Sequence, residues 1–128
     1  MQKRLNPGYE KAYKFALQII RACESLSAER REYVLTKQLL RCGTSIGANL
    51  AEAEAAISGA DLSSKISIAY KECQETKYWI RLLCDADYLS SELAEELFDA
   101  ADEIARILYA ALHTLRIGPQ RNSMANDH

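Results

Sequence analysis

Few side chains in this sequence belong to the types that carry out acid–base, nucleophilic or metal chemistry. The two histidines are His113, near the C-terminal end, and His128, the last residue. Di-iron and di-manganese sites in helix bundles use inward Glu residues with Glu-x-x-His motifs, and neither histidine has Glu three positions before it. No Ser or Cys has a plausible His partner for nucleophilic catalysis. We therefore expect no catalytic residue, no metal, no cofactor and no small-molecule substrate.

The four cysteines also lack a pattern for metal or redox chemistry. Cys23, Cys42, Cys73 and Cys84 form neither a CxxC pair nor a Cys/His metal spacing. Each lies on or beside an apolar helical stripe. We therefore predict that they are reduced thiols of the core.

The segment from Arg41 to Glu54 departs most from ordinary helical sequence. Gly43 and Gly47 lie one turn apart in a long helical pattern, although glycine in a helix costs roughly 0.5–1 kcal/mol relative to alanine. The pair is not a phosphate-binding loop, because no Lys-Ser/Thr follows it and no strand precedes it. We predict instead that the thin helix lets large rings come close, and the candidates are Tyr70, Tyr78 and Trp79.

Asn49 follows in the same segment, where the helical period places it on the core stripe. A buried amide destabilises a fold unless it is hydrogen-bonded. We therefore predict that Asn49 links its helix to Glu72 or Glu75 of the next helix.

Apolar periodicity predicts four helices that position these residues. The first begins with Asn6 as N-cap and Pro7 at the first position, and it ends near residues 25–27. The second closes at residues 58–59. The third begins with Asp61 as N-cap and runs to about residue 87, and the fourth runs from residue 90 to a Gly-Pro stop at residues 118–119.

One apolar stripe per helix is expected to form the core. The predicted stripes are Tyr9, Tyr13, Ala16, Ile20 and Cys23 in the first helix; Leu35, Leu39, Cys42, Ile46, Asn49, Ala53 and Ala56 in the second; Leu62, Ile66, Ala69, Cys73, Thr76, Ile80 and Leu83 in the third; and Leu93, Leu97, Ala100, Ile104, Ile107, Ala111 and Leu115 in the fourth.

The stripes and the short connections predict an all-α, antiparallel up-down-up-down four-helix bundle. Residues 1–119 form the single domain, and residues 120–128 are expected to be a flexible tail. No run approaches the ~20 apolar residues of a bilayer span, so we expect a cytoplasmic protein with no membrane contact.

Two regions carry apolar side chains outside these stripes, which predicts a homo-oligomer. A protomer alone would leave part of that surface in water, and large exposed apolar patches usually mark an interface. The expected oligomer contacts are Phe15, Ile19, Ile68, Tyr78, Trp79 and Leu82.

Charge is balanced overall, with a formal net charge of -2, so the whole-protein field does not recruit nucleic acid. The first third is nevertheless basic, and its first helix could contact RNA through Lys3, Arg4, Lys11 and Lys14. Residues 41–56 could also be taken for a helix-turn-helix, but Glu52 and Glu54 would face the phosphates.

The residues Arg41, Ser45, Gly47, Asn49 and Glu52, followed by Glu72 and Glu75, resemble the bacterial four helix bundle protein family. It is also called the 23S rRNA intervening-sequence protein family. The resemblance covers nearly the whole chain and implies a four-helix protomer, often assembled as a homopentameric ring, with no established enzymatic activity. Some relatives serve reverse-transcriptase retroelements as strongly basic, nucleic-acid-binding accessory factors, whereas the pI of this chain is near 5.7.

We therefore expect a non-enzymatic, oligomeric bundle that serves as a scaffold or accessory factor. The alternative is an RNA- or nucleoprotein-binding accessory protein that uses its basic first and second helices.

Overall fold

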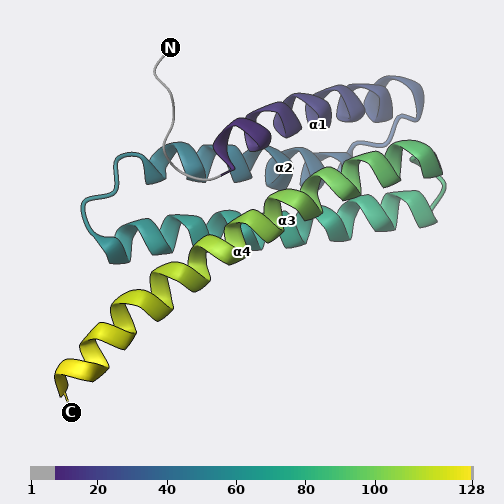
Figure 1. Ribbon diagram of the computed structural model, residues 1–128. Helices are drawn as coiled ribbons and strands as arrows, with labels where there is room; N and C mark the ends of the chain where they lie inside the picture. Colours follow the sequence, from purple (N-terminus) through teal and green to yellow (C-terminus); the bar gives the residue numbers. More distant parts are fainter. Residues whose placement is uncertain (1–7, 128) are drawn as a thin grey trace.

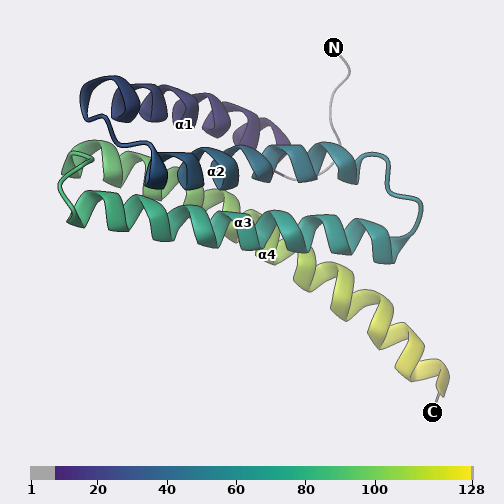
Figure 2. The ribbon, with the colours of Figure 1, turned by 180° about the vertical axis from the view of Figure 1, so that it is seen from behind.

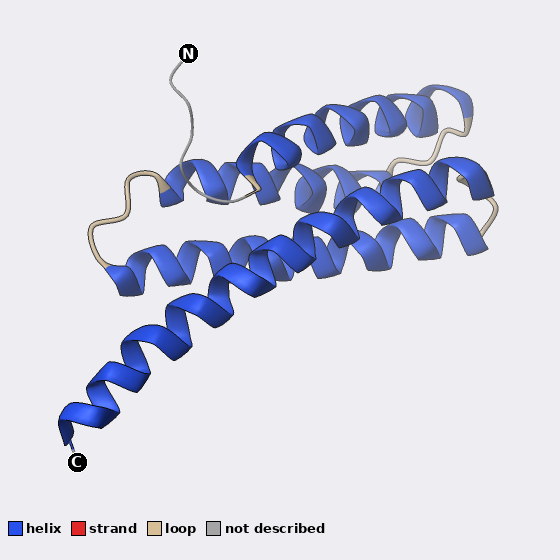
Figure 3. Cartoon of the chain, in the orientation of Figure 1, coloured by secondary structure: helices blue, strands red, loops and turns tan. Residues whose placement is uncertain are grey.

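Four helices make up most of the chain that the computed structural model describes, which is residues 8–127, with side chains for residues 8–115. They are α1 (Tyr9–Glu29), α2 (Val34–Ala53), α3 (Gly59–Asp85) and α4 (Ser91–Asp127), as Figure 1 shows. Within this part of the chain, Figure 3 shows only helices and loops. Successive helices run in opposite directions and pack in chain order (Figures 1 and 2). The predicted all-α up-down four-helix bundle is confirmed.

The four helices do not all pack against their neighbours to the same extent. The pairs α1–α2, α2–α3 and α3–α4 pack along much of their length, whereas α1 and α4 contact each other far less. Figure 2 shows the C-terminal end of α4 extending beyond the other three helices. Lys77 of α3 and Asp102 of α4 form an ion pair of 2.9 Å between the third and fourth helices, and this hydrogen bond lowers the pKa of Asp102.

Large apolar side chains from all four helices fill the centre of the bundle. Burial of each such side chain stabilises the fold by about 1.5–3 kcal/mol. The predicted core stripe of α3 is confirmed from Ile66 to Leu83. The largest fully buried side chains are Phe15, Ile19, Leu26, Leu39, Ile46, Leu50, Ile66, Ile80, Leu83, Leu97, Ile104 and Leu108.

The predicted core stripe of α1 is wrong in phase except at Cys23, which is buried as predicted. Phe15 and Ile19 are buried, together with Leu26, whereas Tyr13 and Ile20 are exposed. Both sets of residues have the spacing of one helix face, so spacing alone does not separate them. The bundle buries the face with the purely apolar side chains and leaves the Tyr13 hydroxyl in water.

The predicted stripe of α4 is also rotated in part. Leu97 and Ile104 are buried as predicted. At three further positions the next residue along the chain is buried instead of the predicted one: Ala101, Leu108 and Leu112 in place of Ala100, Ile107 and Ala111. Because α4 contacts mainly α3, the direction of that one helix decides which side of α4 is covered.

Two helix boundaries in the first half differ from the predicted ones. Asn6 and Pro7 lie outside the described residues; α1 is preceded by Gly8, whose φ of 80° suits glycine. At its other end α1 continues to Glu29, past the predicted end. The carboxylate of Glu32 then accepts hydrogen bonds from Thr36 N at 2.8 Å and Thr36 Oγ1 at 3.1 Å, so an acidic group stabilises the start of α2.

The connection between α2 and α3 is longer than predicted. The second helix ends at Ala53 because the alanines that follow bury too little apolar area to hold another turn on the bundle. The N-cap of α3 is Ser58 rather than Asp61: Ser58 Oγ accepts from Asp61 N at 3.0 Å. The carboxylate of Asp61 accepts in return from Ile57 N at 3.2 Å, in a reciprocal arrangement like a capping box.

The fourth helix does not stop at the Gly-Pro pair of residues 118–119. It extends to Asp127, because a proline removes one backbone hydrogen bond but leaves those of the neighbouring turns in place. The flexibility of residues 120–128 stays a prediction.

Candidate functional surfaces

Polar residues of α2 and α3 gather along one outer face of the bundle, which we call the motif face: Arg41, Ser45, Asn49, Glu52, Glu72 and Glu75. Arg41 is its centre. Its Nη1 donates to Glu72 Oε2 at 3.2 Å and its Nη2 donates to Glu75 Oε2. Trp79 Nε1 donates to the same oxygen of Glu75 at 3.0 Å. One guanidinium therefore joins α2 to two carboxylates one turn apart on α3.

The remaining α2 residues of the motif face form local hydrogen bonds. Ser45 Oγ donates to the carbonyl of Arg41 at 2.6 Å, and Asn49 Nδ2 donates to the carbonyl of Ser45 at 2.8 Å. The predicted link from Asn49 to Glu72 or Glu75 is wrong. Asn49 is half-buried beside the core and Leu50 is fully buried in its place, so its amide reaches its own helix while the longer Arg41 side chain reaches α3.

A second ion pair lies further along the motif face. Lys65 Nζ of α3 is 2.8 Å from Glu52 Oε1 of α2, and the hydrogen bond raises the pKa of Lys65. Arg41 and Glu52 therefore fix α2 against α3 at two points.

The two helical glycines face α1 rather than the aromatic rings of α3. A Cβ added to Gly43 would lie 2.9 Å from both Cγ atoms of Ile19, and one added to Gly47 would lie 3.7 Å from Ala12. The prediction that these glycines admit rings of α3 is therefore wrong. Ile19, which the sequence predicts as an oligomer contact, is instead the side chain that packs against Gly43.

The predicted oligomer contacts divide between the core and the surface. Phe15 and Ile19 are buried within the protomer. Their predicted role as oligomer contacts is therefore wrong, because a side chain enclosed in the core cannot contact another copy. On α3, Ile68, Tyr78 and Leu82 are exposed, and Trp79 is half-buried against the ring of Tyr78 at 5.1 Å between centroids.

The α3 residues outside the core follow a helical period of their own, which defines the outer stripe of α3. Steps of three and four residues connect its members, which lie on the side of α3 away from the buried stripe. The outer stripe consists of Ile68, Lys71, Glu75, Tyr78 and Leu82.

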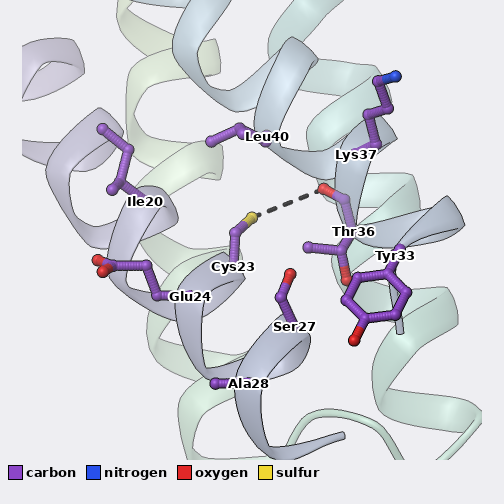
Figure 4. Close-up of a pocket in the computed structure, with 9 residues that line it drawn as sticks. All are labelled: Ile20, Cys23, Glu24, Ser27, Ala28, Tyr33, Thr36, Lys37 and Leu40. Atoms are coloured by element: carbon purple, nitrogen blue, oxygen red, sulfur yellow. Dashed lines mark hydrogen bonds between the residues drawn. The ribbon is translucent and has the colours of Figure 1, made fainter. Parts of the chain in front are cut away.

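An open groove of about 630 Å³ lies between α1 and α2, on a side of the bundle that the sequence analysis did not single out. The sequence prediction missed this groove because it places Ile20 in the core, whereas Ile20 lies at the rim of the groove. The signal that could have located the groove is the set of larger apolar side chains at residues 15, 19 and 26, which form the buried face of α1. In Figure 4, Glu24 and Lys37 lie on opposite sides of this groove. We call it the α1–α2 groove; its lining is Ile20, Cys23, Glu24, Ser27, Ala28, Tyr33, Thr36, Lys37 and Leu40.

Of the basic residues proposed to contact nucleic acid, two can be placed. Lys11 pairs with Glu103 of α4 at 3.1 Å, and Lys14 is exposed on α1. Both line a smaller groove between α1 and α4. Lys3 and Arg4 lie outside the described residues.

Three of the four thiols are enclosed in the core, as predicted, and Cys84 is half-buried. Cys23 Sγ donates to the carbonyl of Thr36 at 3.7 Å, which is the dashed line in Figure 4. Desolvation by burial raises the pKa of Cys23 to about 12, that of Cys42 to about 11 and that of Cys73 to about 12. Such thiols are protonated and unreactive at neutral pH.

Among the described side chains, no group of three or more His, Cys, Asp or Glu residues could hold a metal ion. The same part of the chain contains no helix long and apolar enough to cross a membrane.

Comparison with known proteins places this arrangement in a family. A family model described as 23S rRNA-intervening sequence protein matches residues 6–110. The chain is 41% identical to a protein of unknown function from the S23 ribosomal protein family of Bacteroides thetaiotaomicron, whose crystal structure superposes with a TM-score of 0.80. That match covers 81% of this chain and 96% of the other. A comparison with curated proteins finds no match. The chain therefore belongs to the 23S rRNA-intervening sequence protein family.

Proposed function

We propose that this protein is a non-enzymatic homo-oligomer that serves as a cytoplasmic scaffold or accessory factor. The observation that carries the proposal is the position of its exposed apolar side chains. Tyr78 and Leu82 on α3, and Ile20 and Leu40 at the α1–α2 groove, are all exposed although the core is complete without them. Exposed apolar patches on two separate surfaces are typical of a protein that binds other copies of itself.

The polar residues of the motif face support a structural role. Arg41, Glu72 and Glu75 are engaged with one another, and Glu52 is engaged with Lys65. These ion pairs hold α2 and α3 in one register, and so they also fix the surface that α3 presents to a partner.

The number of subunits that we propose is five, which the family resemblance implies. Size exclusion coupled to light scattering tests it at micromolar concentration. We expect five times the 14.4 kDa protomer mass. A mass near one protomer would overturn the oligomer, and a dimer would keep the apolar argument but exclude the pentamer.

A second candidate function, RNA or nucleoprotein binding, has one observation in its favour. Lys14 and Arg21 are exposed on the same helix as Lys11, and they line grooves between α1 and α4. Contacts with phosphates make binding strongly salt-dependent. Retention on an RNA column that falls steeply between low and moderate salt, and that Lys14→Glu with Arg21→Glu abolishes, would favour this function over the scaffold alone.

A further inference from the structure

We propose that the α1–α2 groove of one copy receives the Tyr78–Leu82 turn of α3 from a second copy. This pairing rests on the proposed oligomer and specifies its contact. It is heterologous, because the two surfaces that meet are different, and such a contact builds a ring when the rotation between copies closes.

The groove is long enough to receive one turn of helix. Its α1 wall runs from Ile20 to Ala28, which is about 12 Å at 1.5 Å per residue, and its other wall runs from Tyr33, the residue before α2, to Leu40, which is about 10 Å. Tyr78 and Leu82 are one turn apart, or about 6 Å. An apolar pair at this spacing is the usual anchor when a helix binds in a groove between two others.

The lining of the groove suits an apolar occupant. Ile20, Leu40 and Tyr33 are exposed at its edges, and Cys23 and Thr36 on its floor are buried. The polar side chains of the floor already have hydrogen-bond partners within the protomer, because Cys23 donates to the Thr36 carbonyl and Thr36 Oγ1 donates to Glu32. An apolar side chain is therefore the group that gains most by entering.

Charges at the two surfaces are complementary. The groove has Glu24 on its α1 rim and Lys37 on its α2 rim (Figure 4), and neither forms an ion pair with another described residue. At 100° per residue, Arg81 and Glu75 lie on opposite flanks of the line from Tyr78 to Leu82. Among the described side chains Arg81 pairs with Asp85 alone, at 4.0 Å, and its own side chain is 80% exposed.

Glu75 already accepts from Arg41 and Trp79 of its own copy, so Arg81 is the charged group of this turn that the groove can engage. Pairing Arg81 with Glu24 places the Arg81 flank of the incoming turn on the α1 side of the groove. This charge pair would therefore set the orientation of the contact, while the apolar anchor provides most of its affinity.

Two single variants test the pairing, because each one blocks a different surface. Leu40→Arg places a charge in the groove, and Tyr78→Arg removes the anchor from α3. Their matched controls are Leu17→Arg and Tyr109→Arg, since Leu17 is 40% exposed against 38% for Leu40, and Tyr109 is 60% exposed against 58% for Tyr78. Circular dichroism first establishes that each variant keeps its helix content and melts cooperatively.

Light scattering then gives the mass of each folded variant. We expect Leu40→Arg and Tyr78→Arg to be monomeric when separate, and to form a dimer when mixed in equal amounts. The mixture contains one intact groove and one intact anchor, so a single contact can form and no further copy can add. Both control variants are expected to keep the native mass.

Several outcomes would overturn the pairing. A homodimer formed by either blocked variant alone would mean that like surfaces meet. Native mass in both blocked variants, or loss of assembly in the controls instead, would place the contact elsewhere and leave the proposed oligomer intact. A native protein that is itself monomeric would overturn the proposed oligomer together with this pairing.

Discussion

At the scale of single residues, alanine substitutions of the two helical glycines are expected to have different effects on the free energy of unfolding. Gly43→Ala places a methyl group 2.9 Å from two atoms of buried Ile19, so we expect a loss of about 1–3 kcal/mol of unfolding free energy from overpacking. Gly47→Ala meets only ordinary contacts at 3.7 Å and gains helix propensity, so it should be neutral or stabilising by up to about 1 kcal/mol. Urea unfolding of both variants measures the difference, and equal effects would contradict the assigned approach of α1 to α2.

Arg41 and Asn49 also differ in what their replacement should do. Arg41→Met breaks the ion pairs with Glu72 and Glu75, and we expect a loss of about 1 kcal/mol that shrinks in 1 M NaCl, because surface ion pairs are screened by salt. Asn49→Leu removes only a hydrogen bond within α2 and should change stability by less than about 1 kcal/mol at either salt concentration. A salt-dependent loss in Asn49→Leu instead would restore the interhelical role first predicted for that residue.

The buried thiols predict a dependence of stability on alkaline pH. Their folded pKa values of about 11 to 12 exceed the ordinary value of 9.0. Their contribution to stability is therefore complete below pH 9 and is lost as the pH rises from 9 through 11–12, because the unfolded chain loses its thiol protons first. Urea unfolding at pH 8 and pH 10 should show this loss, and Cys73→Ala should reduce it. An identical decline in Cys73→Ala would assign it to other groups.

At the scale of the helices, the cap of α3 deserves a direct test. Ser58→Ala removes the oxygen that accepts from Asp61 N, and loss of an N-cap of this kind costs about 0.5–2 kcal/mol. Ser64→Ala, on the exposed side of the same helix, is the control and should be neutral or slightly stabilising. Thermal melts of the two variants test whether Ser58 is the N-cap of α3, and equal melting temperatures would contradict that assignment.

At the scale of the whole molecule, assembly should appear in the thermal stability. If only the folded protomer binds other copies, the melting temperature rises with protein concentration by mass action. We expect this rise in the native protein and in Tyr109→Arg, and its absence in Tyr78→Arg. Calorimetry over a hundredfold range of concentration measures it, and a melting temperature that is constant for the native protein would argue against the oligomer.

The sequence by itself determined the number of helices, their antiparallel order and the buried stripe of α3. These follow from apolar periodicity and from short connections, which are local properties. It also singled out Arg41, Glu72 and Glu75, although it gave the interhelical role to Asn49. The helical period places residues 49 and 50 near the same face, and only the placement of the helices packed against α2 decides which of them is buried.

Only the tertiary structure decided which face of α1 enters the core and which helix the glycines of α2 approach. Two stripes of α1 share the same spacing, so the choice depends on how Phe15 and Ile19 pack against the neighbouring helices. The α1–α2 groove follows from that choice, because burying Ile19 turns Ile20 outward to its rim. A groove between two helices is formed by their relative placement, and no local pattern in one helix contains that information.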